Sequence, residues 1–166
     1  LQTDASQYGY SFCVEHRGSP DDKWLPFQST AGLWKKAHMA YHVNRKESLA
    51  LLKGLRHVAL FVESIFEAAL PRTEPFITVE IATDSTTALA WAKGGTVDPR
   101  TSTKSVEFRA LCDLAAALHM EVQILRKKCQ VVKLYHVAGQ ENSEADRLSR
   151  LGYRLVDGKP IASLLR

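Results

Sequence analysis

The stretch His136-Val-Ala-Gly-Gln-Glu-Asn-Ser-Glu-Ala-Asp-Arg-Leu-Ser-Arg150 brings an imidazole, an amide and a carboxylate close together in the chain. The apolar run just before it, 131–136, predicts a strand, and Gly139 and Asn142 are residue types that favour a turn. The rest of the stretch has a helical pattern. Asp146 is therefore predicted to lie in the first turn of a helix.

Local structure alone can explain Asp146. Ser143-x-x-Asp146 resembles a capping box, and an acid near a helix N-terminus is favoured by the helix dipole. Three other acids, Asp4, Glu47 and Asp84, also stand at the ends of predicted elements. The interpretation of Asp146 depends on whether the four acids converge.

The amino-terminal third of the chain predicts an antiparallel meander. Residues 1–6 read as the end of a strand, and further strands are predicted at 10–15 and 23–30, with turn residues between them. Asp4 lies at the end of the first of these strands. An isolated aspartate there is usually a turn former, so Asp4 is uninformative by itself.

The strongest helical pattern in the chain runs over residues 45–70, where apolar side chains recur every three or four positions. Asn44-x-x-Glu47 offers a capping box as one explanation of Glu47. However, Glu47 precedes Leu51 by four residues, so its side chain continues the apolar face towards the core. A carboxylate in that position is costly unless a cation meets it, which favours a functional role.

A strand over 76–84 and a helix over 85–93 are predicted next. Asp84 lies at the carboxyl end of this strand, where open α/β sheets place their ligand sites. An N-cap role for Asp84 or Ser85 is the competing explanation.

The next segment predicts a loop over 96–104 and a helix over 106–119, and residues 121–125 read as a short strand or as the end of that helix. The basic cluster 126–128 is interpreted as a solvated loop before the last strand.

The composition indicates one globular domain of 166 residues with 45% hydrophobic content. Lys and Arg exceed Asp and Glu by 22 to 18, a mild excess that is compatible with a polyanionic partner such as nucleic acid. Three widely spaced cysteines argue against a disulfide framework and a cysteine zinc site. We expect an intracellular protein of the cytoplasm, with a virus-like particle or the nucleus as alternatives.

Four acids in one cleft repel each other, and divalent cations between them make the arrangement tolerable. Oxygen ligands without cysteine favour Mg²⁺ or Mn²⁺ over zinc. His38 and His42 have a spacing that could bind zinc from one helical face, but no zinc-protease pattern accompanies them.

Taken in order, these motifs resemble those of a ribonuclease H domain, and most of all the domains attached to the reverse transcriptases of LTR-type or tyrosine-recombinase-type retrotransposons and pararetrovirus-like elements. The matching motifs are Thr3-Asp4-Ala5-Ser6, Asn44-Arg45-Lys46-Glu47, Thr83-Asp84-Ser85 and His136-x-x-Gly139-x-x-Asn142-x-x-x-Asp146. The resemblance covers residues 1–152 and leaves 153–166 as a C-terminal tail. Because the chain opens within an apparent strand, we expect it to be a piece of a larger polyprotein.

The resemblance implies an α/β ribonuclease H-like fold, with a mixed five-stranded sheet of three antiparallel strands and two parallel ones, flanked by helices. It implies a metal-dependent endonuclease that hydrolyses the RNA strand of RNA–DNA hybrids during reverse transcription, leaving 5′-phosphate and 3′-hydroxyl ends. An upstream reverse transcriptase in the same polyprotein is the implied partner.

The resemblance also assigns roles to individual residues. Asp4, Glu47, Asp84 and Asp146 would bind two Mg²⁺ ions, with Mn²⁺ as a substitute, and His136 would shuttle a proton or assist product release. The implied substrate contacts are Asn44, Ser85 and Asn142 beside the acids, and Arg100, Lys104 and Arg109 at phosphates. Cellular relatives often carry a basic helical insertion where this chain has only residues 94–104, which predicts weaker independent binding of the hybrid.

Two alternatives remain. A catalytically silent ribonuclease H-like module, serving as a nucleic-acid-binding or spacer domain beside a polymerase, is expected to lack one or more of the acids. Another nuclease or an integrase of the same superfamily is expected to order its acids differently and to lack the element from His136 to Asp146.

Overall fold

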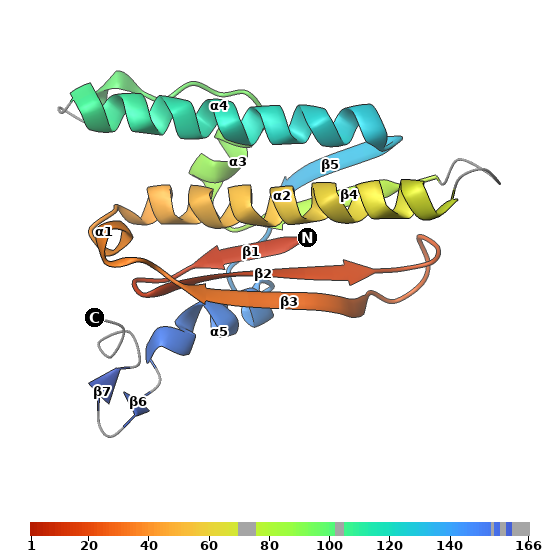
Figure 1. The fold of residues 1–166 in the computed structure, drawn as a ribbon, viewed down its shortest axis with the longest axis horizontal. Helices are drawn as coiled ribbons and strands as arrows, with labels where there is room; N and C mark the ends of the chain where they lie inside the picture. Colours follow the sequence, from red (N-terminus) through yellow and green to blue (C-terminus); the bar gives the residue numbers. More distant parts are fainter. Residues whose placement is uncertain (70–75, 102–104, 154, 157–158, 161–166) are drawn as a thin grey trace.

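The computed structural model describes residues 1–69, 76–101, 105–153, 155–156 and 159–160. A five-stranded mixed sheet forms its centre, with the strands in the order β3-β2-β1-β4-β5 (Figure 1). The first three strands are antiparallel, whereas β4 runs parallel to β1 and β5 parallel to β4. This arrangement confirms the predicted fold class. The strands are β1 (Gln2–Ala5), β2 (Gly9–His16), β3 (Leu25–Leu33), β4 (Thr78–Thr83) and β5 (Val131–His136).

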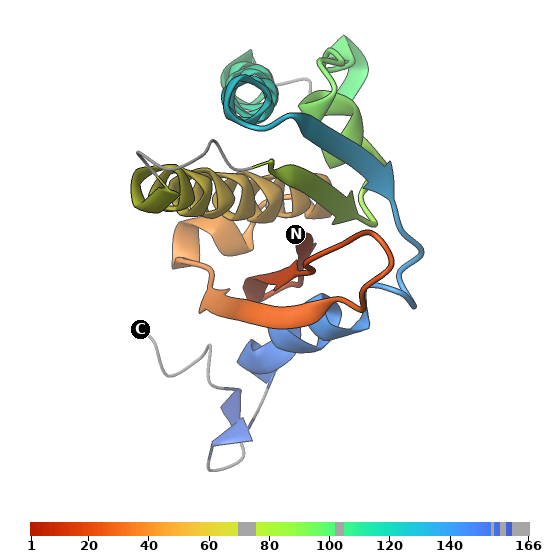
Figure 2. The same ribbon diagram turned by 90° about the vertical axis from the view of Figure 1, so that its right-hand side faces the viewer.

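Helices cover both faces of the sheet. The long helix α2 crosses one face with α4 stacked behind it, and the short α5 lies under β1 and β2 on the opposite face (Figures 1 and 2). The helices are α1 (Lys36–Met39), α2 (Val43–Ala69), α3 (Thr86–Ala92), α4 (Ser105–Lys128) and α5 (Ser143–Ser149), with 3-10 turns at Pro99–Thr101 and Arg150–Tyr153. In the tail, β6 (Leu155–Val156) pairs with β7 (Lys159–Pro160). Of the helices described, none is long and apolar enough to cross a membrane.

The inward face of α2 forms much of the core, as its periodicity predicts. Leu51 and Leu55 are fully buried, and Val58 and Val62 continue the same stripe. At Gly54 an added Cβ would lie 3.1 Å from the Thr3 side chain, so the absence of a side chain lets β1 approach the helix closely. This close packing holds the start of α2 beside the end of β1.

The helix α4 is longer than predicted. It runs without interruption to Lys128, so the short strand considered for 121–125 is not formed. The physical reason is that Val122 and Leu125 extend the buried stripe of Leu118 at helical spacing, and all three side chains are fully buried. The basic cluster 126–128 forms the last turn of α4, where positive charge is favoured by the helix dipole.

The pairing register of the sheet decides which ends of strands meet. Thr3 of β1 pairs with Thr83 of β4, and Thr83 pairs in turn with His136 of β5. Because β1 and β4 are parallel, the residues that follow Thr3 and Thr83, which are Asp4 and Asp84, emerge at the same edge of the sheet.

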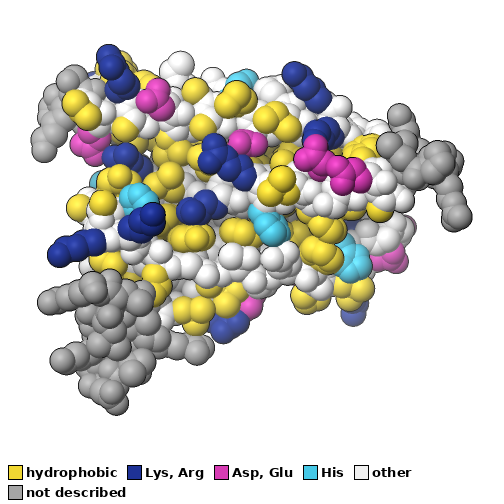
Figure 3. Space-filling model, viewed as in Figure 1, with side chains coloured by type: hydrophobic (Ala, Val, Ile, Leu, Met, Phe, Trp, Pro, Cys, Tyr) yellow, Lys and Arg dark blue, Asp and Glu magenta, His cyan; other side chains and the backbone are white. Residues whose placement is uncertain are grey.

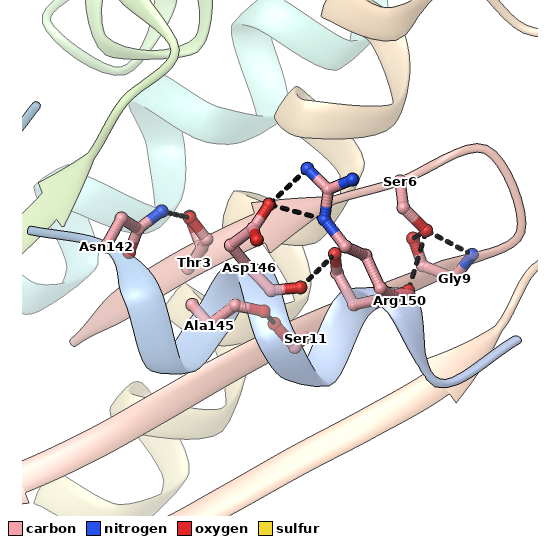
Figure 4. Close-up of polar contacts among 9 residues, drawn as sticks. Thr3, Ser6, Gly9, Ser11, Asn142, Ala145, Asp146 and Arg150 are labelled. Carbon is pink, nitrogen blue, oxygen red and sulfur yellow. Dashed lines mark hydrogen bonds and ion pairs between the residues drawn. The ribbon is translucent and has the colours of Figure 1, made fainter. Parts of the chain in front are cut away.

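Hydroxyl groups of the first hairpin attach α5 to the sheet. The Ser11 hydroxyl donates to the Ala145 carbonyl at 2.5 Å, and the Ser6 hydroxyl donates to the Ser149 carbonyl at 2.6 Å (Figure 4). At Gly9 the helix approaches so closely that an added Cβ would lie 2.6 Å from the Ser149 carbonyl oxygen. These contacts fix the position from which Asp146 projects.

We expect Gly9→Ala to destabilise the domain by about 1–3 kcal/mol, because the methyl group has to displace backbone atoms of α5 and β3. The measurement is urea unfolding. Gly18→Ala is the matched control, since its Cβ would meet only the exposed Asp22 carboxylate, at 3.1 Å. Equal unfolding midpoints for the two variants would contradict the tight packing of α5.

Candidate active site

Three of the four predicted acids form one cluster. Asp4 from β1, Glu47 from α2 and Asp84 from the loop after β4 each offer a carboxylate oxygen, and these oxygens lie within 4.8 Å of one another. Asp4 and Glu47 are buried, while Asp84 is partly exposed. Residues that are far apart in sequence are thus brought together by the register of the sheet and the packing of α2.

The environment of Glu47 favours the protonated carboxyl in the absence of metal. Burial, followed by the nearby carboxylates of Asp4 and Asp84, raises the pKa of Glu47 from 4.5 to about 9, although the backbone N–H of Ala5 donates to it. Its Oε2 atom is buried without a hydrogen-bond partner. The capping-box alternative is wrong, because α2 begins at Val43 and Asn44 already lies inside the helix.

Asp4 is held in a similar environment. Burial raises the pKa of its carboxyl group, the Ser149 hydroxyl opposes that shift by hydrogen bonding, and the carboxylates of Asp84 and Asp146 reinforce it. The charge of Arg150 acts on Asp4 in the opposite direction. The pKa of Asp4 therefore depends on the charges of Asp146 and Arg150, which lie on the other side of the site.

The choice between Asp84 and Ser85 as helix cap is settled in favour of Ser85. The Ser85 hydroxyl accepts a hydrogen bond from the Ala88 N–H at 3.2 Å and is the N-cap of α3. Asp84 is not used in this way, and its Oδ1 atom is buried with no hydrogen-bond partner. The carboxylate faces the cluster and is available to a ligand.

Asp146 lies on α5 but is not part of the cluster of three. Its Oδ1 atom accepts hydrogen bonds from Nε and Nη2 of Arg150, at 2.8 and 2.6 Å (Figure 4). The predicted capping box at Ser143 is not observed, because α5 begins at Ser143 itself and its N-cap is Asn142, whose side chain makes no capping hydrogen bond.

The donor set of the cluster fits a hard divalent cation. Two buried carboxylate oxygens, Oε2 of Glu47 and Oδ1 of Asp84, have no hydrogen-bond partner, and unpaired buried carboxylates are costly. A divalent cation would satisfy both atoms and relieve the repulsion among the acids. Oxygen ligands are those that Mg²⁺ and Mn²⁺ prefer.

His136 lies at the rim of the cluster. Its Nε2 atom is 3.0 Å from the backbone carbonyl of Asp84, and the ring is exposed. Since a carbonyl can only accept, Nε2 carries the proton in this contact, which leaves Nδ1 as the atom that can exchange a proton with solvent. The imidazole is therefore both anchored and accessible.

The histidine pair considered for zinc is not arranged as a metal site. The short helix α1 contains His38 but ends before His42. The ring of His38 packs against Tyr41 with centroids 5.1 Å apart, while Nδ1 of His42 accepts from the Asn44 N–H at 3.3 Å. Within the described residues, neither histidine belongs to a group that could hold a metal ion.

The predicted substrate contacts occupy different environments. Asn44 and Ser85 line a hollow of about 210 Å³ that also contains Glu47 and Asp84. Asn142, in contrast, has no exposed surface, and its amide donates to the Thr3 carbonyl at 2.9 Å (Figure 4). In this conformation Asn142 holds the loop before α5 against β1 and does not face a ligand.

Of the predicted phosphate contacts, Arg100 and Arg109 do not line the hollow that contains the acids. The Arg100 guanidinium is exposed and forms a forked ion pair with Asp98, with a shortest distance of 2.7 Å. Arg109 is exposed on α4, and Lys104 lies outside the described residues. Their contacts with phosphate remain predictions.

A larger cleft of about 500 Å³ adjoins the acidic hollow, and Asn44 and two threonines of α3 line both. Its walls come from the start of α2, from α3, from the loop after it and from the start of α4. Apart from Asn44, its lining residues were not predicted as site residues; they are His42, Arg45, Thr86, Thr87, Ala90, Trp91, Thr96, Asp98, Glu107 and Leu111. Only the neighbourhood of Asn44 and Glu47 in the sequence could have indicated His42 and Arg45.

Similarity to known proteins agrees with this architecture. The structure matches the ribonuclease H1 of the archaeon Halobacterium salinarum with a TM-score of 0.55 and 16% identity, covering 89% of this chain and 90% of that one. The chain has the ribonuclease H fold. A ribonuclease H1 isolated from compost, solved in complex with an RNA/DNA hybrid, gives a TM-score of 0.55 at 14% identity and covers 98% and 96% of the two chains.

In sequence, the chain is 25% identical over 162 residues to an enzymatic polyprotein of Cassava vein mosaic virus. The match covers 96% of this chain but only 20% of the polyprotein. No family model matches the chain. The predicted ribonuclease H fold is thus confirmed, and the match to part of a viral enzymatic polyprotein agrees with the resemblance stated from the sequence motifs.

The stability of the metal-free domain is expected to fall as the pH rises from about 5 to 9. Unfolded Glu47 releases its proton near its ordinary pKa of 4.5, whereas folded Glu47 keeps it up to about pH 9. The folded state therefore binds more protons in this window, and its free energy of unfolding decreases with pH.

Glu47→Gln should flatten this decrease and stabilise the metal-free domain at pH 8 by about 1 kcal/mol or more. The measurement is thermal unfolding in a chelator at several pH values, with the exposed Glu67→Gln of the same helix as the control. A pH profile of Glu47→Gln that matches that of wild type would show that Glu47 does not cause the effect.

Proposed function

We propose that this domain is a metal-dependent endonuclease that hydrolyses the RNA strand of RNA–DNA hybrids, giving 5′-phosphate and 3′-hydroxyl ends. The proposal is carried by the convergence of Asp4, Glu47 and Asp84 within 4.8 Å on a ribonuclease H fold, with two of their buried oxygens lacking any partner. One of the structural relatives was solved with an RNA/DNA hybrid, which supports this class of substrate.

The metal ligands would be the three clustered acids together with Asp146. When bound there, two divalent cations supply activation of water and stabilisation of the leaving oxygen in phosphodiester hydrolysis. The carboxylates provide the negative charge that holds the cations, and metal binding releases the proton of Glu47. His136, anchored by the Asp84 carbonyl, can accept or return a proton at Nδ1 beside the reacting phosphate.

The cleft beside the acids would receive the hybrid. Its lining includes Arg45, His42, the amide of Asn44 and the hydroxyls of Thr86 and Thr87, which suit phosphate and sugar oxygens. Two acids also line it, Asp98, which is paired with Arg100, and Glu107. A hybrid is recognised largely by its shape and by 2′-hydroxyl groups, so no base-specific contacts are needed. Trp91 adds an apolar floor.

The segment that forms one side of this cleft carries an excess of positive charge, while the acids Asp98 and Glu107 line the other side. Between residues 33 and 56, Glu47 is the one acid, and it is buried within the site. Basic side chains gather over α1 and the start of α2 on the face seen in Figure 3. The cations of this segment are Lys35, Lys36, Arg45, Lys46, Lys53 and Arg56.

We further infer that the domain acts during reverse transcription as part of a polyprotein that contains a reverse transcriptase. The match to a fifth of a viral enzymatic polyprotein supports this context. A polymerase that produces RNA–DNA hybrids would supply the substrate.

The first test is cleavage of a labelled RNA–DNA hybrid with Mg²⁺ or Mn²⁺, beside double-stranded DNA. We expect cutting of the hybrid alone, and a loss of more than about 100-fold in Asp84→Asn, since even outer partners of metal ligands cost about 10- to 100-fold. Asp113→Asn, an exposed acid on α4, is the control. Metal binding by calorimetry without any cutting would indicate a domain that needs its polymerase partner, whereas absence of metal binding would favour the silent binding module instead.

A second test concerns the cleft. Arg45→Gln should weaken hybrid binding and reduce the slope of log affinity against log salt by about 1, as expected for one phosphate contact. Its guanidinium carbon lies over the Tyr41 ring, 3.6 Å from the ring centroid, so the side chain is pre-ordered for that contact. Arg126→Gln is the control, because Arg126 lies in the last turn of α4, away from the start of that helix where the cleft is. It should leave the affinity and the salt slope unchanged, both measured by fluorescence anisotropy. Identical salt slopes for the two variants would place the hybrid elsewhere.

A further inference from the structure

The four acids of the site differ in their partners, a difference that the sequence motifs do not predict. Asp4, Glu47 and Asp84 meet within 4.8 Å, with unpaired oxygens among them, whereas Oδ1 of Asp146 receives both Nε and Nη2 of Arg150. The fourth carboxylate is thus already paired with a cation that belongs to the chain.

This pair is held on a fixed backbone. The Arg150 N–H donates to the Asp146 carbonyl at the end of α5, and the helix is attached to the sheet through Ser11 and Ser6 (Figure 4). Asp146 therefore cannot approach the cluster by movement of its helix without breaking these contacts. Rotation of its side chain away from Arg150 is the less costly route.

The guanidinium of Arg150 occupies the oxygen of Asp146 that a divalent cation would otherwise contact, because Nε and Nη2 lie 2.8 and 2.6 Å from Oδ1. In the metal-free domain Arg150 therefore balances the charge of this carboxylate, which is the task that divalent cations perform when they bind.

We propose that Arg150 is a positioning residue that takes the place of a cation at Asp146 and must release this carboxylate before the second divalent ion can bind. The proposal rests on the proposed function, because it presupposes that the acids bind metal. Arg150 makes the two binding events unequal: the cluster of three acids is ready for the first ion, while the second competes with the guanidinium.

The same helix offers a matched control. Arg147 pairs with Glu144 at 2.8 Å, and the two arginine side chains are similarly exposed, at 57% and 60%. Arg147→Gln therefore removes an equal charge and a comparable ion pair from α5 without touching Asp146.

The experiment is calorimetric titration of Mg²⁺ into wild type, Arg150→Gln and Arg147→Gln, together with thermal unfolding with and without Mg²⁺. We expect Arg150→Gln to tighten the weaker of two binding events by about two- to fivefold, the range that exposed ion pairs reach, and to change the stronger event less. Without metal it should unfold at a lower temperature than Arg147→Gln, and saturating Mg²⁺ should remove this difference.

Arg150→Lys keeps the charge but loses the fork, and its second affinity should lie between those of wild type and Arg150→Gln. This variant also carries the test if Arg150→Gln does not fold. Equal behaviour of Arg150→Gln and Arg147→Gln, or weaker second binding in Arg150→Gln, would overturn the role of Arg150 while leaving the nuclease proposal intact. Absence of Mg²⁺ binding by wild type would overturn both.

Discussion

The repulsion among buried carboxylates is the constraint on which the site depends. The pairing of Thr3 with Thr83 brings Asp4 and Asp84 to one edge of the sheet, and the close packing of α2 at Gly54 holds Glu47 beside them. Such a cluster is unfavourable in the folded protein unless protons or cations accompany it. The fold therefore holds these acids together at a cost in stability, which ligand binding can offset.

On the opposite face of the sheet, polar contacts hold the short helix α5 in place. A helix of only seven residues has little apolar surface, and hydroxyl groups of Ser6 and Ser11 hold α5 through its backbone carbonyls instead. Buried Asn142 adds an amide contact with β1. Polar contacts are directional, so they specify the orientation of α5 more narrowly than apolar packing alone, and this orientation decides where Asp146 projects.

The cleft next to the acids is formed by the starts of α2 and α4 together with α3. The start of α2 contributes both Glu47 and Arg45, and the first turn of α3 follows directly from Asp84 through the cap residue Ser85. The proposed metal ligands Glu47 and Asp84 are thus neighbours along the chain of residues that line the cleft. Movement of either helix would change the positions of a metal ligand and of its neighbouring lining residues together.

The sequence by itself determined the five strands of the main sheet, the long helix α2 and the order of the acids, because helical and strand periodicity are local and the motif residues stand at element ends. It also placed Glu47 on the inward face of its helix. Only the tertiary structure decided that three acids cluster while Asp146 pairs with Arg150, that Asn142 is buried, and that α4 continues to Lys128. These outcomes depend on register, on packing against distant elements and on competition between charges, and local patterns do not encode them.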